Sequence, residues 1–223
     1  MATAASDILT KEQIAFLELV TAERSCTEHF YFTGGTALSA FYLHHRFSED
    51  IDLFSEEEFE FLPIRAFIGK VQRALKLTKV DYRQYFGLHT FELFFSAKNI
   101  LKVDFSYYPF PRIEKGERYG ALAVDSVFDI AVNKVHTIAL RPRARDFIDL
   151  YFIVHDYGYD LFDLLMKAKV KFDWHIDPIQ LGSRLFEAAD IRDLPRMIRK
   201  VEERAWRTLF VREAEKLKTR IFE

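Results

Sequence analysis

The sequence predicts an α+β (α/β) fold, in which a mixed or antiparallel sheet is flanked by helices and followed by a helical C-terminal domain. Residues 78–108 form β-rich runs separated by turn residues, whereas helical periodicity begins near Asp125 and continues to the C-terminal region. The chain has 223 residues, 49% of them hydrophobic, which is enough for one large or two small domains. We therefore expect a first domain over residues 1–124 and a helical domain over residues 125–223.

The composition restricts the classes of function. The formal net charge is −2, so any nucleic-acid binding would need a local basic patch. Cys26 is the single cysteine, which excludes an intramolecular disulfide and a cysteine-rich zinc site. Residues 1–7 lack the pattern of a signal peptide, and no apolar run approaches the roughly 20 residues that cross a bilayer. These features predict a cytoplasmic protein with no membrane partner.

The first half of the chain begins with a helix over Ser6–Glu28 that Thr10 can cap. The stretch Phe30–Phe54 then predicts an apolar strand, a glycine turn, an amphipathic helix over Thr36–His45 and a second strand. Another helix is expected over Leu62–Leu77, with a proline in its first turn. This order alternates helices with strands, as expected for helices that cover a sheet.

Three β-rich runs follow, and the economical interpretation is an antiparallel meander. The runs are Val80–Phe86, Thr90–Phe95 and Ile100–Tyr108, with a turn at Gly87–His89 between the first two and a later short strand at Gly120–Val124. The helical part is then expected at Ser126–Leu140, Arg143–Ile153, Asp160–Lys169, Pro178–Ala188 and Leu194–Leu217. Pro142 cannot continue a helix and separates the first two.

Asp50 and Asp52 are the first candidate functional residues. They lie two residues apart on a predicted strand, so their side chains point to the same face of the sheet. Two like charges on one face repel each other and are tolerated best with a cation between them. Gly34 and Gly35 precede a predicted helix, where free backbone N–H groups can approach a phosphate. The stretch therefore predicts a combined metal and phosphate site.

These motifs also carry a family resemblance. Gly34-Gly35-Thr36 followed by Asp50-x-Asp52 resembles the first motif of the nucleotidyltransferase superfamily, which has a polymerase-beta-like fold. The longer string Gly34–Phe54 resembles the AbiEii family, the toxins of type IV toxin–antitoxin pairs, whose relatives include the MenT toxins. Further resemblance lies in Asp129–Lys134 and Arg145–Tyr151, so it extends over about half of the chain.

The resemblance implies that a nucleoside monophosphate is transferred from an NTP to an acceptor with the help of Mg²⁺. It also implies that two ions are held by three carboxylates, those of Asp50, Asp52 and Asp104. Asp104 would hold the second metal ion or act as the base that deprotonates the acceptor. Judged on its strand alone, Asp104 would equally well alternate onto a solvated sheet face.

The resemblance also implies a phosphate cradle built from Gly34, Gly35 and Thr36, and a point charge that Lys134 supplies to the phosphates. In the absence of the resemblance, Lys134 would be read as a snorkelling lysine. Arg46 is compatible with a nucleotide contact or with a surface role.

Arg145, Asp146 and Asp149 follow on the next predicted helix, where positions 146 and 149 share a face. The resemblance implies that they form a network that positions Lys134 or the base. A helix-surface ion pair with a purely structural role is the alternative.

Three functions are consistent with the sequence. By resemblance, the acceptor is a tRNA 3′ end, growth stops because aminoacylation is blocked, and a cognate antitoxin is the protein partner. A second possibility is the same chemistry on a protein or a small molecule, which the near-neutral charge favours over RNA. A third is an NTP-binding interaction module without catalysis, against which the set of three carboxylates argues.

Overall fold

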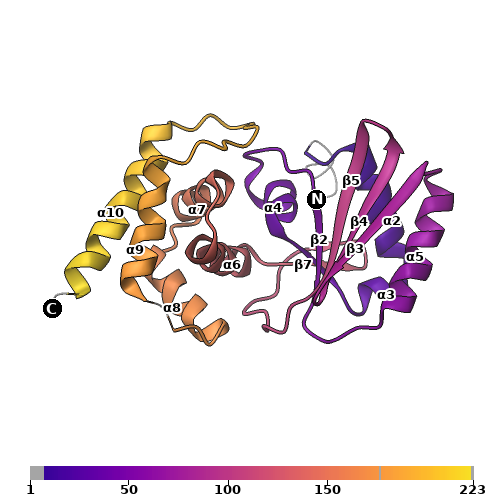
Figure 1. Ribbon diagram of the computed structural model, residues 1–223, viewed down its shortest axis with the longest axis horizontal. Coiled ribbons are helices and arrows are strands. Elements are labelled where there is room, and N and C mark those ends of the chain that lie inside the picture. Colours follow the sequence, from indigo (N-terminus) through magenta and orange to yellow (C-terminus); the bar gives the residue numbers. More distant parts are fainter. Residues whose placement is uncertain (1–7, 176, 222–223) are drawn as a thin grey trace. The chain divides into compact units, whose positions relative to one another are not determined.

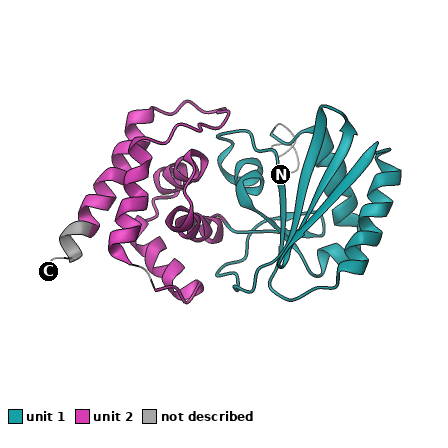
Figure 2. Ribbon diagram, viewed as in Figure 1, with its two compact units in different colours: residues 1–126 teal, residues 127–223 magenta. Residues whose placement is uncertain are grey.

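The computed structural model describes residues 8–175 and 177–221, and the side chains up to residue 217. The chain divides into two compact units, one ending at Ser126 and the other beginning at Val127 (Figure 2). Residues 1–7, on which the expectation about a signal peptide and the start of the first predicted helix depend, lie outside the described residues. Among the described helices, none has the length and apolar composition required to span a membrane.

The first unit is built on a seven-stranded mixed sheet, which confirms the predicted fold class. Its order is β3-β4-β5-β2-β1-β7-β6 (Figure 1). The strands are β1 (Tyr31–Thr33), β2 (Ile51–Ser55), β3 (Lys79–Tyr85), β4 (Leu88–Ser96), β5 (Asn99–Tyr107), β6 (Arg118–Tyr119) and β7 (Leu122–Val124).

The predicted meander is confirmed, because β3, β4 and β5 pair in sequence and antiparallel. The turn between β3 and β4 was expected at residues 87–89, but β4 already begins at Leu88. The chain reverses over Phe86 and Gly87 instead, with Phe86 at φ 48°. The favoured two-residue hairpin turns need a positive φ at their first position, and Phe86 supplies it. The reversal therefore takes two residues and not the three that the sequence suggested.

Two pairings in the sheet join strands that are distant in the sequence. β2 pairs in parallel with β5, and β1 pairs in parallel with β7. Parallel neighbours cannot be joined by a tight turn, so each requires a long crossover. The β2–β5 pairing places the Asp-x-Asp strand directly beside the strand that carries Asp104.

Helices α2 (Lys11–Ala22), α3 (Arg24–Thr27) and α5 (Phe61–Ala74) lie on the same side of the sheet (Figure 1). Thr10 caps α2 in a capping box with Gln13, as the sequence predicts. The rings of Phe16 and Phe67 join α2 to α5 at 6.1 Å between centroids. The single helix expected up to Glu28 is interrupted at Glu23, whose backbone is extended.

The glycine-turn helix differs from the expectation at both ends. Helix α4 (Gly34–Leu38) begins at the first glycine and continues as a π-helix, η1 (Ser39–Leu43). His44 then ends the helix in the left-handed conformation, at φ 51°. This short, irregular helix connects β1 to the loop before β2, and its first turn lies beside the candidate site.

The second unit is helical. It contains α6 (Val127–Leu140), α7 (Ala144–Tyr157), α8 (Leu161–Lys171), α9 (Pro178–Phe186), the short 3₁₀ turn η2 (Glu187–Ala189) and α10 (Glu203–Ile221). The last helix was predicted to begin at Leu194 but begins at Glu203. Pro195 would be tolerated in the first turn of a helix, so it does not by itself account for the later start. Trp206 and Phe210 of α10 pack on Phe147 of α7 and form part of the core.

Candidate active site

The candidate site begins at the turn between β1 and α4. Gly34 has φ +76°, a conformation that side chains other than glycine rarely adopt. A Cβ at this position would lie 2.1 Å from Oδ2 of Asp52, so the backbone of the turn and this carboxylate are in direct contact. Glycine is therefore required at position 34 both by conformation and by the space that Asp52 occupies.

Beside this turn, four residues that are in register form one row across four neighbouring strands of the sheet. Thr33 of β1 is in register with Asp52 of β2, Asp52 with Asp104 of β5, and Asp104 with Thr90 of β4. Registered neighbours on one face lie within about 5.5 Å at Cβ. The pairing thus brings the two predicted carboxylates, 52 residues apart in sequence, side by side.

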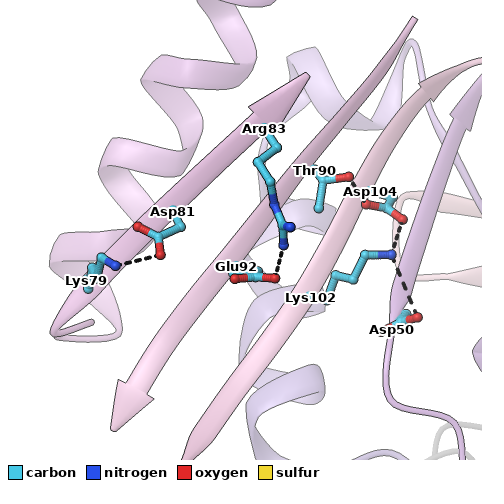
Figure 3. Close-up of polar contacts among 8 residues, drawn as sticks. All are labelled: Asp50, Lys79, Asp81, Arg83, Thr90, Glu92, Lys102 and Asp104. Carbon is cyan, nitrogen blue, oxygen red and sulfur yellow. Dashed lines mark hydrogen bonds and ion pairs between the residues drawn. The ribbon is translucent and has the colours of Figure 1, made fainter. Parts of the chain in front are cut away.

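Asp104 is buried, and both of its carboxylate oxygens accept hydrogen bonds (Figure 3). The hydroxyl of Thr90 donates to Oδ1 at 2.6 Å, and the ammonium of Lys102 donates to Oδ2 at 2.6 Å. Thr90 comes from the neighbouring strand, and Lys102 lies two residues before Asp104 on the same strand face. These two contacts fix the orientation of the Asp104 carboxylate.

The Lys102 ammonium also lies 3.8 Å from Oδ2 of Asp50 (Figure 3). Partial burial would lower the pKa of Lys102, but the hydrogen bond to Asp104 and the charges of Asp104, Asp50 and Asp52 together raise it. The lysine is therefore held as a cation among three carboxylates.

Asp50 lies just before β2 and not within it, because that strand begins at Ile51. Its backbone is held by Thr36, whose buried hydroxyl donates to the Asp50 carbonyl at 2.5 Å. Thr36 thus connects α4 to the entry of the Asp-x-Asp strand, a structural role that the motif did not suggest. A contact between Thr36 and phosphate stays a prediction.

Gly35 makes the second close approach in the turn. A Cβ there would lie 2.3 Å from Nη2 of Arg46 and 3.2 Å from the Ser48 hydroxyl. Arg46 is only 3% exposed, and its Nη1 donates to the Phe47 carbonyl at 3.0 Å. The surface alternative for Arg46 is therefore wrong, since its guanidinium is buried against the turn.

Lys134, Asp146 and Asp149 form a cluster of their own in the helical unit. The Lys134 ammonium of α6 lies 2.7 Å from Oδ1 of Asp146 and 2.8 Å from Oδ2 of Asp149, both on α7. Among the described residues, Arg145 makes no hydrogen bond or ion pair, so it does not take part in the network in which the sequence placed it. A second buried pair, Lys171–Asp129 at 2.8 Å, joins α8 to α6.

The comparisons with known proteins agree with this geometry. The profile of the family described as the nucleotidyl transferase AbiEii toxin of type IV toxin–antitoxin systems matches residues 17–218. The chain belongs to the AbiEii family. It is accordingly a nucleotidyltransferase of the toxin class, for which an NTP is the substrate and an antitoxin the partner.

Individual relatives support the same assignment. The chain is 36% identical over 168 residues to the uncharacterized protein aq_aa25 of Aquifex aeolicus (strain VF5), an alignment that covers 74% of this chain and 76% of that protein. The fold of this chain is similar to that of JHP933 from Helicobacter pylori, with a TM-score of 0.60 and 18% identity. The superposition covers 95% of this chain and 94% of JHP933. The fold is also similar to that of MenT4, a nucleotidyltransferase toxin from Mycobacterium tuberculosis H37Rv, with a TM-score of 0.52, 16% identity and coverage of 98% and 88%.

An AbiEii nucleotidyltransferase uses a divalent metal ion with its NTP, and the residues of the candidate site fit such an ion. Asp52 and Asp104 are neighbouring oxygen donors, the type that Mg²⁺ prefers, and Asp104 already holds one positive charge, that of Lys102. Within residues 8–175 and 177–221, no three His, Cys, Asp or Glu side chains form a preassembled metal-binding group. Binding of the ion would therefore require the carboxylates to turn towards it.

Lys102 and Thr90 are the site residues that the sequence analysis missed. Lys102 carried a usable signal, because a lysine two residues before a strand carboxylate shares its face. Thr90 had no such signal, since its contact with Asp104 depends on the register between β4 and β5.

Proposed function

We propose that this AbiEii chain transfers a nucleoside monophosphate from an NTP to an RNA, the 3′ end of a tRNA, in a reaction that depends on Mg²⁺. The observation that carries the proposal is the registered pair Asp52 and Asp104 on parallel neighbours, directly beside the Gly34 turn. Two converging carboxylates next to a close-approach glycine turn combine oxygen ligands for metal with backbone access for phosphate.

In the proposed reaction, the acceptor hydroxyl oxygen bonds to the α-phosphorus while the bond to the bridging oxygen breaks, pyrophosphate leaves, and the hydroxyl proton passes to a base, either Asp104 or solvent. Bound Mg²⁺ would supply charge neutralisation and Lewis acidity at the phosphates. Asp50, Asp52 and Asp104 would hold it, two ions being the number that the three carboxylates suggest. Both oxygens of Asp104 already accept hydrogen bonds, so at least one of these contacts would have to yield whether Asp104 acts as a metal ligand or as the base that takes the hydroxyl proton.

The remaining predicted residues would bind and position the nucleotide. Gly34, Gly35 and Thr36 would face the β- and γ-phosphates with their backbone N–H groups. Lys134 would supply positive charge, and its two contacts support a role for Asp146 and Asp149 in holding its ammonium in place.

The test is nucleotide transfer with the purified chain, Mg²⁺, each α-labelled NTP in turn and total RNA. We expect label in the tRNA fraction and a loss of about 10³-fold in Asp52→Asn, since a metal ligand supplies several kcal/mol of transition-state stabilisation. Asp81→Asn is the matched control, because Asp81 lies on β3 of the same sheet and forms an ion pair with the exposed Lys79, away from the site. Transfer that survives in Asp52→Asn, or label that never enters RNA, would contradict the proposal.

A protein or small-molecule acceptor is the second candidate, which the net charge of −2 favours because an RNA-binding surface is usually basic. The same assay with a cell extract in place of RNA distinguishes the two. Asp52-dependent label in protein or in small metabolites, with none in RNA, would replace tRNA as the acceptor and retain the chemistry.

A further inference from the structure

Lys102 lies with its ammonium close to the carboxylates of the candidate metal site, which favour a positive charge there. Its ammonium is 2.6 Å from Asp104 and 3.8 Å from Asp50, and the charge of Asp52 adds to the same field. Figure 3 shows its side chain extending along the sheet face towards both aspartates. A divalent ion bound by the same oxygens would have to approach within a few ångströms of this ammonium.

The Lys102 ammonium and a metal ion would compete for the same carboxylate oxygens of Asp104. Mg²⁺ coordinates carboxylate oxygens at about 2.0–2.1 Å. Both oxygens of Asp104 are engaged, because Oδ2 accepts a hydrogen bond from Lys102 and Oδ1 accepts one from Thr90. Like charges a few ångströms apart are unfavourable even where solvent screens them. Metal binding and the Lys102–Asp104 contact therefore compete.

Lys102 is able to move aside. Its side chain is 39% exposed, whereas that of Asp104 is 9% exposed and tied to Thr90. A lysine has a flexible four-carbon stem and a compact charge, so its ammonium can leave a partner at small cost. The buried carboxylate is the fixed part of the contact and the lysine is the exchangeable part.

We propose that Lys102 is a resident counter-cation of the metal site, which a divalent ion must displace before the nucleotide can react. The inference rests on the proposed function, in which the carboxylates of residues 50, 52 and 104 bind metal. Lys102 acts through these carboxylates and is a positioning residue. In the absence of metal, Lys102 offsets the repulsion between the carboxylates, and it weakens metal binding to the nucleotide-free protein.

The test measures Mn²⁺ binding to the full chain by calorimetry and by the electron paramagnetic resonance of free Mn²⁺, without nucleotide. We expect Lys102→Gln to bind Mn²⁺ about tenfold more tightly than the unaltered protein, which corresponds to about 1.4 kcal/mol. Lys102→Arg retains the charge and should stay within about twofold of the unaltered protein. Lys79→Gln is the matched control, since Lys79 is an exposed lysine in an ion pair on the same sheet and should change nothing.

The outcomes separate this inference from the proposed function. Equal or weaker Mn²⁺ binding by Lys102→Gln, with the far-UV circular dichroism of the unaltered protein, would overturn the role of Lys102 and leave the metal site intact. Lys102→Met provides a second neutral variant if the glutamine variant does not fold. Absence of Mn²⁺ binding in every variant, with and without an NTP, would overturn the metal-dependent function itself. A general packing role for Lys102 predicts no increase in affinity, so a gain specific to the neutral variants supports the proposal.

Discussion

Lys102 in the first unit and Lys134 in the helical unit each lie beside two aspartates, and the two clusters differ in how firmly the cation is held. Lys102 is 39% exposed and makes one short contact, whereas Lys134 is 11% exposed and lies between two carboxylates that are 5% and 0% exposed. Exposed ion pairs contribute about 0–1 kcal/mol to stability, while breaking a buried pair costs about 3–5 kcal/mol. The comparison teaches that the same residue types can form an exchangeable contact at a solvated sheet face and a permanent one between helices.

The largest expected difference is in stability. Lys134→Met would leave Asp146 and Asp149 buried without this counter-charge, so we expect a loss of about 3–5 kcal/mol in the free energy of unfolding. Lys102→Met should cost about 1 kcal/mol or less. Urea unfolding monitored by tryptophan fluorescence measures the first effect selectively, because both tryptophans, Trp174 and Trp206, belong to the helical unit.

A double-mutant cycle is the control for that prediction. If the cost arises from uncompensated charge, combining Lys134→Met with Asp149→Asn should cost less than the sum of the two single changes. Additive costs would show that packing and not charge holds the cluster, and the contrast with Lys102 would then fail.

Two glycines with similar backbone geometry give the next largest effect. Gly34 and Gly158 have φ values of +76° and +70°, but only at Gly34 would a Cβ meet a neighbour, Oδ2 of Asp52. Gly158→Ala should therefore cost only left-handed strain, about 1–2 kcal/mol, with unchanged nucleotide transfer. Gly34→Ala should also displace Asp52 and reduce the transfer rate by about 10²-fold, as expected for a catalytic group moved by about 1 Å.

Thermal unfolding and the labelled-NTP assay measure both alanine variants side by side. An active Gly34→Ala enzyme would show that the contact with Asp52 does not position this carboxylate. Reduced activity in Gly158→Ala would show that backbone strain at the end of α7 affects nucleotide transfer. The predicted difference between the two glycines would then be wrong.

The smallest effect is a pH dependence that the two units share. Burial lowers the pKa of His136, which stacks on Phe172 at 4.0 Å, and burial also lowers the pKa of His89 in the first unit. The unfolded chain then binds protons below the ordinary value of 6.5 while the folded chain does not, so stability is complete above pH 6.5 and falls as the pH decreases below it.

Urea unfolding by tryptophan fluorescence between pH 5 and 8 measures this dependence for the helical unit. We expect His136→Gln to have a flatter profile below the ordinary histidine pKa than the unaltered protein. A profile that keeps its slope in His136→Gln would assign the pH dependence to other groups of the helical unit.

Local patterns predicted much of the fold correctly. The meander, the capping of α2 by Thr10 and the end of α6 before Pro142 each depend on residues within a few positions of one another. The late start of α10 shows the limit of such patterns, because a helical pattern extends from residue 194 while the structure forms the helix only from Glu203. The interruption at Glu23 had no comparable signal in the sequence.

The sequence by itself determined the chemistry: a glycine pair before a helix, an Asp-x-Asp strand and the motifs by which the AbiEii family is identified. These signals are contained in short segments, and residue type and spacing are sufficient to express them. Only the tertiary structure decided which strand lies beside β2, that Asp52 closes the space at Gly34, and that Lys102 stands among the carboxylates. Parallel pairing joins residues far apart in the chain, and the free energy that selects one register comes from burying the whole sheet face. No local pattern contains that information.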